Sequence, residues 1–301
     1  MCPHCKKPGK IVKFGSYQRA SDKKVCQRYR CKNCQRTFSE THYSIDYRLR
    51  KRYINQAVFR SLCSGVSQRR CAILFGVHRD AIARRLLRFG LCAEHNLKVY
   101  RQSRPSVTQL LFDELETFEH TKCKPLTVAI AVEDKSRKIL ALKVGKIPAK
   151  GPLASFSRKK YGFRPCERRA CLESIFQDLK CCLASQGLVK TDQSKAYPPF
   201  IRRFLKFWNH QASPGKRGCV VGQGELKEGH WDPLFSLNHS FAMIRDGLKR
   251  LSRRTWCTTK SPKHLEFALN MYAWFHNLLL ESKNRKDLRL DWLSSPSPES
   301  L

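Results

Sequence analysis

The sequence predicts a multidomain protein with three successive parts: a small N-terminal metal-dependent unit, an all-α unit, and a mixed α/β domain that ends in C-terminal helices. Three observations predict this order. Two Cys-x2-Cys pairs fall within the first 34 residues, helical periodicity runs over about 49–91, and strand-like runs followed by helical stretches fill most of the remainder. We expect the parts at 1–42, 43–100 and 107–282, with a disordered tail at 283–301.

The net charge predicts the chemical class of the partner. The 301 residues contain 59 Lys and Arg against 24 Asp and Glu, a formal charge of +35. A charge that large opposes compaction unless a polyanion neutralises it, which predicts binding to nucleic acid. No apolar stretch approaches the roughly 20 residues that span a bilayer. The N-terminus MCPHCKKPGK carries no export signal, so we expect a cytoplasmic protein with no membrane partner.

The two cysteine pairs, Cys2-x2-Cys5 and Cys31-x2-Cys34, predict a zinc ribbon. Each pair places two thiolates on one side of a tight bend, and two such bends can close a tetrahedral Zn²⁺ site. Fifteen cysteines without an export signal favour metal binding over disulfides. The alternative is a set of unrelated surface cysteines.

Two neighbours of the pairs are ambiguous. His4 lies between two expected ligands and Cys26 precedes the second pair, but a four-cysteine site needs neither. Tyr29 and Phe38 flank the second pair and can form its small core. Because the first forty residues carry little apolar periodicity, we expect this unit to be unfolded without metal.

Residues 67–88, SQRRCAILFGVHRDAIARRLLR, predict a helix-turn-helix. Ala72 allows the two helices to approach, Gly76 can take the positive φ of the turn, and Ile82 packs the second helix on the first. The second helix, over about 78–88, suits the major groove of DNA, and an ordinary basic helical hairpin is the alternative. The residues expected to contact DNA are Arg69, Arg70, His78, Arg79, Arg84, Arg85 and Arg88.

The α/β domain is predicted from a series of short elements. A polar linker is expected at 101–106. Strands are expected at 109–112, 126–132, 139–144 and 188–191, with a further one at 220–221. A loop at 151–165 and helices at 167–185, 199–208 and 237–280 complete the series.

Two aspartates of this domain predict a metal-dependent nuclease chemistry. Asp113 ends one apolar strand and Asp192 ends another. A carboxylate there is costly unless a divalent cation neutralises it, and two-metal phosphoryl transfer needs carboxylates that converge on Mg²⁺ or Mn²⁺. Taken singly, each aspartate could instead be a turn or helix-cap residue.

Asn238 is the candidate for a third ligand. It opens a helix, so it can serve as an N-cap, and its amide oxygen can also ligate a hard cation. The basic stretch after it, tipped by Trp256, suits contact with a DNA backbone, although a solvated basic face is the simpler reading. Its expected DNA contacts are Arg245, Lys249, Arg253 and Arg254.

The chain resembles bacterial transposases of the insertion-sequence-one family and related groups. The matching segments are CPHC, QRYRCKNCQRTFS, GVSQRRCAILFGVHRDAIAR, FDELETF, KTDQSKAYP and LNHSFAMIRDGLKRLSRRTWCTTKS, which together span nearly the full length. The resemblance implies a zinc ribbon, a helix-turn-helix and an RNase-H-like catalytic domain. It also implies that Asp113 and Asp192 are the first two members of a DDE-type triad, and that the protein is found in the bacterial nucleoid.

The third member departs from the family pattern, because Asn238 stands where the family has Glu. Related groups use Asn there. The resemblance implies double-stranded DNA partners, namely the element ends and the target, and at least a homodimer that joins two ends. Two other classes stay open: a catalytically inactive, domesticated DNA-binding regulator, and an RNA-binding ribosome-associated zinc protein.

Overall fold

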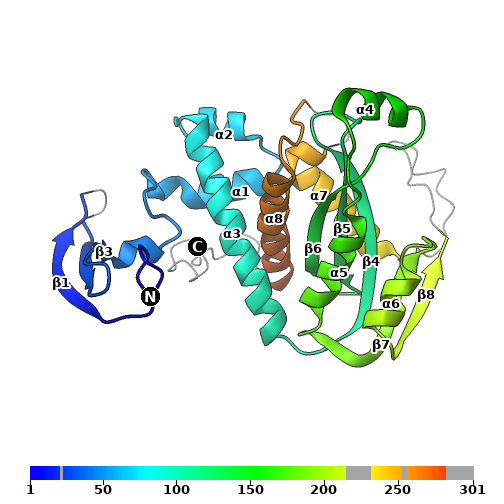
Figure 1. The fold of residues 1–301 in the computed structure, drawn as a ribbon, viewed down its shortest axis with the longest axis horizontal. Coiled ribbons are helices and arrows are strands. Elements are labelled where there is room, and N and C mark those ends of the chain that lie inside the picture. The colour runs from blue at the N-terminus through cyan, green and yellow to red at the C-terminus, as the bar shows by residue number, and fades with distance from the viewer. Residues whose placement is uncertain (21–22, 215–231, 253–255, 283–301) are drawn as a thin grey trace.

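The structure is a computed structural model that describes residues 1–20, 23–214, 232–252 and 256–282. Figure 1 shows a small sheet at one end, a group of helices in the middle, and a larger sheet flanked by helices at the other end. The strand expected at 220–221, Arg253, Arg254 and the tail at 283–301 lie outside the described residues.

The N-terminal unit is a three-stranded antiparallel sheet in the order β1-β2-β3. Its strands are β1 (Ile11–Gln18), β2 (Val25–Cys31) and β3 (Thr37–Ser39). The buried hydrophobic cluster of this sheet contains Cys2, Cys31 and Phe38. A core this small cannot by itself offset the entropy cost of ordering forty residues.

The helical unit consists of α1 (Asn55–Cys63), α2 (Gln68–Leu74) and α3 (Arg79–Ser103). The Ser67 side chain caps α2 by accepting from the Arg70 N–H, and the His78 side chain caps α3 by accepting from the Asp80 N–H. Gly76 forms the intervening turn with φ +56°, a backbone conformation that favours glycine. The local signals for this turn are thus all realised in the structure.

Helix α3 is much longer than the expected second helix at 78–88. It continues through the first half of the stretch expected as a linker, because its C-terminal half packs on α8 (Pro262–Glu281). At Gly90 the two helices approach so closely that a Cβ would lie 2.4 Å from the Cβ of Phe267. Near its end, Arg101 donates to the carbonyl of Leu140 in the large sheet at 2.9 Å.

The large sheet has five strands in the order β6-β5-β4-β7-β8. Strands β4 (Val107–Phe118), β5 (Pro125–Glu133) and β6 (Ile139–Lys146) pair antiparallel, whereas β7 (Leu183–Asp192) is parallel to β4, and β8 (Trp208–Ser213) is parallel to β7. The result is a mixed sheet with a parallel pair at β4 and β7.

Helices cover both faces of this sheet. On one face, α5 (Arg168–Leu179) and α6 (Pro198–Phe204) share a core with Leu110 and Phe112 of β4. On the other face, α7 (Phe235–Gly247) and α8 share a core with Leu111 of β4 and with α1 and α3. Side chains alternate along a strand, so Asp113 lies on the α7 face.

Several expected element boundaries were wrong. The expected loop at 151–165 contains helix α4 (Leu153–Tyr161), and the expected helix at 167–185 ends at Leu179 because β7 begins at Leu183. The expected helix at 199–208 ends at Phe204, since the chain from Trp208 pairs with β7, a long-range contact that no local pattern reveals. The helical stretch expected at 237–280 is divided into α7 and α8.

No helix in the described part of the chain combines the length and the apolar character that crossing a bilayer requires.

Candidate functional site

The four cysteines of the two Cys-x2-Cys pairs come together in the N-terminal unit. Their Sγ atoms all lie within 4.8 Å of one another. The Sγ atoms of Cys2 and Cys34 are 3.7 Å apart, and those of Cys5 and Cys31 are 3.9 Å apart. Tetrahedral Zn–S bonds of about 2.3 Å require sulfur separations of about 3.8 Å, so this donor set fits zinc.

The surroundings of Cys2 favour its thiolate. Burial alone would raise its pKa, but backbone N–H groups of Cys5 and His4 point at the sulfur and lower the pKa of Cys2 to about 6. The two ambiguous neighbours are engaged elsewhere: the His4 ring contacts the Thr37 carbonyl, and the Cys26 thiol donates to the Lys24 carbonyl. The cluster is therefore built from the four cysteines alone.

The helix-turn-helix presents most of its expected DNA contacts to solvent. The exposed members are Arg69, Arg70, His78, Arg79 and Arg84. A hollow of about 570 Å³ lies between residues 48–51 and the start of α3, and its lining includes Arg48, Arg50, Lys51 and Arg84. This concave, cationic surface suits a phosphate backbone.

Arg85 does not belong to that surface, and the expectation that it contacts DNA was wrong. Only 2% of it is exposed. Its guanidinium donates to the Asn55 side chain at 2.8 Å, to the Ala81 carbonyl at 3.0 Å and to the Lys51 carbonyl at 3.1 Å. The helical period of the sequence placed Arg85 near the polar face, but the Asn55 side chain and backbone carbonyls of α3 and of the preceding loop accept from its guanidinium and hold it inside. Arg88 is half-buried and donates to a backbone carbonyl.

Asp113 and Asp192 are brought side by side by the parallel pairing of β4 and β7. Leu110 pairs with Val189 and Leu111 with Lys190. The pairing ends there, and this register, if extended by two residues along both strands, would bring Asp113 level with Asp192. The two carboxylates also interact electrostatically, because the charge of Asp192 raises the pKa of Asp113. Both side chains project from the same face, since both lie two residues beyond the pair Leu111 and Lys190.

Asp113 is held in an environment that disfavours its charge. Burial and the neighbouring Asp192 and Glu114 carboxylates raise its pKa to about 6, although the Glu114 N–H and the Tyr197 hydroxyl donate to it. The Tyr197 hydroxyl lies 3.0 Å from Asp113 Oδ1 and 3.3 Å from Glu114 Oε2. Burial and these carboxylates raise the pKa of Tyr197 far above its usual range, so its hydroxyl stays a donor.

The other carboxylates of this region already have cationic partners. Glu114 is paired with Arg168 at 3.0 Å, and Asp134 is paired with Lys190 at 2.7 Å. In the part of the chain that the structure describes, neither Asp113 nor Asp192 has a basic partner. Carboxylate oxygens are the ligands that Mg²⁺ and Mn²⁺ prefer, so this pair fits a divalent cation.

Asn238 lies inside α7 and is not its N-cap, which corrects the expectation that it opens the helix. The helix begins at Phe235 and its N-cap is Leu234. Asn238 is exposed, and its amide donates to Asp232 at 2.9 Å. The structure thus places Asn238 on the helix that covers the Asp113 face, but the contact it shows is with Asp232 rather than with Asp113 or Asp192.

A polar bridge joins the strand of Asp192 to the helix of Asn238. Asp134, which follows β5, binds Lys190 of β7 and accepts from the Ser236 hydroxyl of α7 at 3.0 Å. Lys190 and Ser236 each lie two residues before the predicted site residue. The bridge was missed from the sequence, because the β5–β6 turn carries no signal that it returns to this site.

The basic residues that follow Asn238 in the sequence differ in their exposure to solvent. Lys249 is exposed, whereas Arg245 is half-buried. The nearby Arg250 donates to the carbonyl of His264. Of this stretch, Lys249 is therefore the described residue best placed to meet a phosphate.

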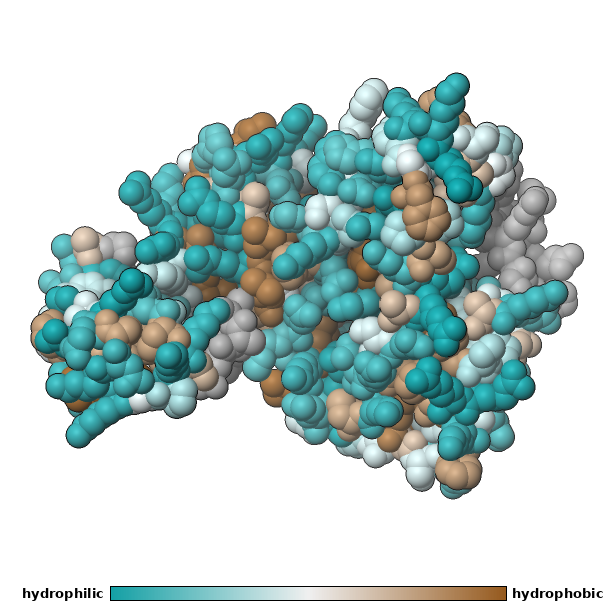
Figure 2. All heavy atoms as spheres, viewed as in Figure 1, coloured by the Kyte–Doolittle hydropathy of each residue, from teal (hydrophilic) through white to brown (hydrophobic). Residues whose placement is uncertain are grey.

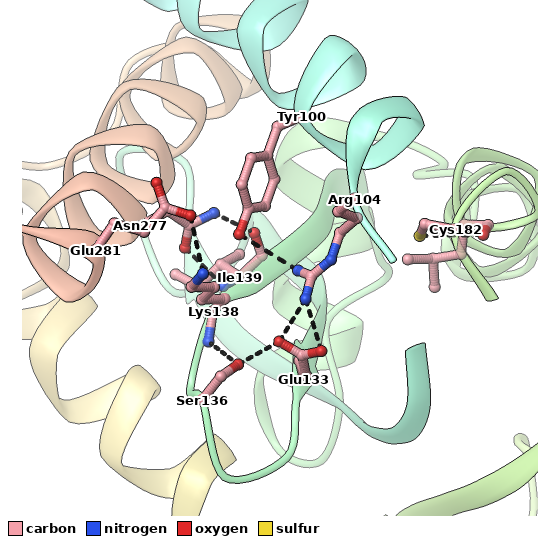
Figure 3. A network of polar contacts seen from close by, with 10 residues as sticks. Tyr100, Arg104, Glu133, Ser136, Lys138, Ile139, Cys182, Asn277 and Glu281 are labelled. Atoms are coloured by element: carbon pink, nitrogen blue, oxygen red, sulfur yellow. Dashed lines mark hydrogen bonds and ion pairs between the residues drawn. The ribbon is translucent and has the colours of Figure 1, made fainter. Parts of the chain in front are cut away.

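Helix α3 is anchored to the large sheet by the network of polar contacts in Figure 3. Arg104, next to the end of α3, forms two bonds to the Glu133 carboxylate at 2.6 and 2.7 Å. Asn277 of α8 binds both the N–H and the carbonyl of Ile139. Glu133 adjoins Asp134, which pairs with Lys190 two residues before Asp192. The Arg104–Glu133 ion pair therefore connects the end of α3 to the surroundings of the aspartate pair.

Comparison with known proteins gives little further guidance. No protein-family model matches the chain, and no curated protein matches it. Among solved structures, the crystal structure of the Mos1 strand transfer complex is similar over 78% of this chain and 79% of that chain, with 11% sequence identity and a TM-score of 0.23. A TM-score this low supports no conclusion about fold or function.

Proposed function

We propose that the protein is a DNA transposase. It binds the ends of its own mobile element through the zinc ribbon and the helix-turn-helix, and its α/β domain cleaves and joins DNA strands with the help of Mg²⁺ or Mn²⁺. The observation that carries the proposal is the pair Asp113 and Asp192: level on neighbouring parallel strands, on one face, and without a basic partner in the described residues.

Three further features support the proposal. The four-cysteine cluster fits zinc, the exposed arginines of the helix-turn-helix suit DNA, and the charge of +35 matches a polyanionic partner. The order of strands, with the first aspartate inside β4 and the second at the end of the parallel β7, is the arrangement expected for an RNase-H-like domain.

The division of work among the residues follows from their surroundings. Asp113 and Asp192 would hold the divalent cation, with Asn238 as a third, uncharged ligand. A bound cation of this kind activates a water or a 3′-hydroxyl and stabilises the leaving oxygen. Tyr197 orients the Asp113 carboxylate, and the Asp134 bridge fixes the spacing between β7 and α7. Joining two element ends requires at least a homodimer on double-stranded DNA, acting in the bacterial nucleoid.

Strand transfer is the decisive assay. Zinc-loaded protein is mixed with labelled DNA that carries the element's own ends, with Mg²⁺ or Mn²⁺, beside an Asp192→Ala control. Joined product that is absent from the control supports the transposase. Arg84→Ala should weaken end binding and transfer together, whereas Asp192→Ala should abolish transfer and leave end binding intact.

A DNA-binding regulator is the second candidate, and Asn238 favours it. An uncharged third ligand binds a cation more weakly than a carboxylate, and its amide donates to Asp232. This candidate predicts tight, end-specific binding with no cleavage in either metal. If the wild type shows no strand transfer and an Asn238→Glu variant does, the nuclease site of the wild type is inactive because of Asn238.

A further inference from the structure

Helix α4 carries an apolar surface that takes no part in the hydrophobic cores. It projects from the sheet between β6 and α5, at the edge of the molecule in Figure 1. Phe163 is 81% exposed, Phe156 is 54% exposed and Tyr161 is 40% exposed. Figure 2 shows apolar side chains among hydrophilic ones over this part of the molecule. Aromatic rings held in water in this way need a partner to explain them.

The same helix is strongly cationic. Arg158, Lys159 and Lys160 are exposed, and none of them is paired with an acidic side chain in the described residues. The Lys160 ammonium lies 5.7 Å from the Phe156 ring centroid and 5.6 Å from that of Tyr161. Positive charge interleaved with aromatic rings is the combination that binds nucleic acid without base pairing, because every base has a face that can stack.

A second exposed ring is attached to the same turn of the sheet. The β4–β5 turn holds α4 through the Ser157 hydroxyl, which donates to the Cys123 carbonyl at 2.6 Å. It also holds the loop of Trp256, because the His120 N–H donates to the Thr259 carbonyl at 2.9 Å. Trp256 is fully exposed. The β4–β5 turn is thus hydrogen-bonded to two segments that are distant in sequence and that carry exposed aromatic side chains.

The turn lies close to the aspartate pair along the strand. It follows β4, which carries Asp113 and ends at Phe118. Five residues of strand span about 17 Å, which is about five nucleotides at the rise of roughly 3.4 Å per nucleotide in stacked B-form DNA, and fewer nucleotides if the strand is extended. A strand bound at Asp113 and Asp192 can therefore reach the turn.

We propose that α4 with Phe163, together with the Trp256 loop, binds the unpaired bases of a DNA strand. We name this surface the α4 platform. Phe156, Phe163 and Trp256 stack on bases, and Arg158, Lys159 and Lys160 neutralise the phosphates. A duplex keeps its bases stacked internally, so these rings select single-stranded or locally opened DNA. The platform deepens the proposed function, because it would hold the unpaired strand beside the cleavage site.

The test compares single-stranded and duplex binding by the full-length, zinc-loaded protein. Fluorescence anisotropy is measured with a fluorescein-labelled oligo-dT of about 20 nucleotides and with a duplex of equal length, without Mg²⁺. A Phe156→Ala/Phe163→Ala variant should raise the Kd for oligo-dT at least about tenfold. Its Kd for the duplex, which the helix-turn-helix supplies, should change less than about twofold.

The matched control is Phe207→Ala. Phe207 is 78% exposed but lies between α6 and β8, away from α4. The control should leave both Kd values unchanged. Equal losses on oligo-dT and duplex, or a loss in the control as large as in the double variant, would overturn the proposal.

Two further measurements separate this proposal from the transposase proposal. Oligo-dT carrying 5-iododeoxyuridine should cross-link to Phe156, Phe163 or Trp256, and cross-links confined to residues 1–100 would contradict the platform. Asp192→Ala should keep full oligo-dT binding. If strand transfer fails in the wild type while the ring-dependent binding persists, the transposase proposal falls and the platform stands.

Discussion

The N-terminal unit and the five-stranded sheet each gather side chains that could bind a metal, but these side chains stand in opposite relation to the core. In the N-terminal unit, two of the three buried residues of the hydrophobic cluster, Cys2 and Cys31, are members of the four-cysteine group that fits zinc. In the sheet, two large hydrophobic clusters hold the fold, and Asp113 and Asp192 lie above them. We therefore expect the N-terminal unit to need zinc in order to fold, and the sheet to fold without a cation.

The two units should also differ in stability when no metal is bound. Removing zinc takes away most of the ribbon's core. Without a cation, the sheet carries the half-buried Asp113 carboxylate, which has no basic partner in the described residues. This negative charge is destabilising, and a bound cation would neutralise it. The predictions below follow from this contrast.

Loss of zinc should have the largest effect. A Cys31→Ser variant, or the wild type treated with a chelator, should lose the ordered structure of residues 1–42, because zinc supplies about 10–16 kcal/mol of binding free energy in such units. The part of the chain from α1 onward should keep its unfolding transition. Limited proteolysis and circular dichroism, with zinc measured by mass spectrometry, check both statements.

A matched Cys26→Ser variant is the control, since Cys26 is buried but bonded to the Lys24 carbonyl outside the cluster. It should keep stoichiometric zinc. If Cys31→Ser retained a protease-resistant ribbon, the contrast between the two metal sites would be wrong.

The buried Arg85 tests whether the helical unit is stabilised independently of zinc. An Arg85→Ala variant removes a buried guanidinium that donates to the Asn55 side chain and to three backbone carbonyls, so it should lose about 3 kcal/mol of unfolding free energy. Arg84→Ala is the control, because the exposed Arg84 should contribute less than about 0.5 kcal/mol to stability yet weaken DNA binding. Urea denaturation with and without zinc measures both. Equal losses in the two variants would contradict the burial of Arg85.

Arg84 and Arg85 also show the limit of what the sequence could predict. Local signals predicted the cysteine cluster, the glycine turn and the strand end at Asp192, because each depends on residues close together in the chain. The sequence could not distinguish Arg84 from Arg85, since both lie near the polar face of one helix. Only the position of Asn55 and the preceding loop, a tertiary contact, decides which of them is buried.

The same limit explains what was missed around the aspartates. Asp192 ends β7 as expected, whereas Asp113 lies in the middle of β4, so the expectation that it ends its strand was wrong. Asp134 and Tyr197 contact the site through the sheet register and a chain reversal, which no local pattern reveals. Strand β8 was not predicted, and its first residue, Trp208, was included in the preceding helix, because its sequence, WNHQAS, has no strong alternation and its pairing partner β7 is a long-range contact. Register is a global property, so a single sequence leaves it open.

Asp113 gives the third prediction, which concerns pH. Burial and Asp192 raise its pKa from 3.8 to about 6, so the folded protein binds this proton more tightly than the unfolded chain. Stability from this group is therefore full below about pH 4 and is lost as pH rises through 6. An Asp113→Asn variant without metal should be more stable than wild type by about 2 kcal/mol at pH 8 and equal to it at pH 4.

Mg²⁺ should reverse this order. It should stabilise the wild type at pH 8 and leave the Asp113→Asn variant unchanged, because the amide brings no charge. Urea titrations at both pH values, with and without Mg²⁺, give the four comparisons. A variant that is less stable than wild type in the metal-free protein at pH 8 would show that Asp113 has a stabilising partner.

Tyr197 gives the smallest expected effect and the sharpest check on the site's electrostatics. Its hydroxyl donates to Asp113 and Glu114, which lowers the pKa of Asp113 against the effect of burial. A Tyr197→Phe variant keeps the ring that packs on Phe112 and removes only this donor, so it should lose about 1 kcal/mol of unfolding free energy. The pKa of Asp113 should rise further, and Mg²⁺ stabilisation should begin at a higher pH than in wild type. If the onset stayed where it is in wild type while stability fell, Tyr197 would be a packing residue only, and the Asp113 carboxylate would be oriented by the Glu114 N–H alone.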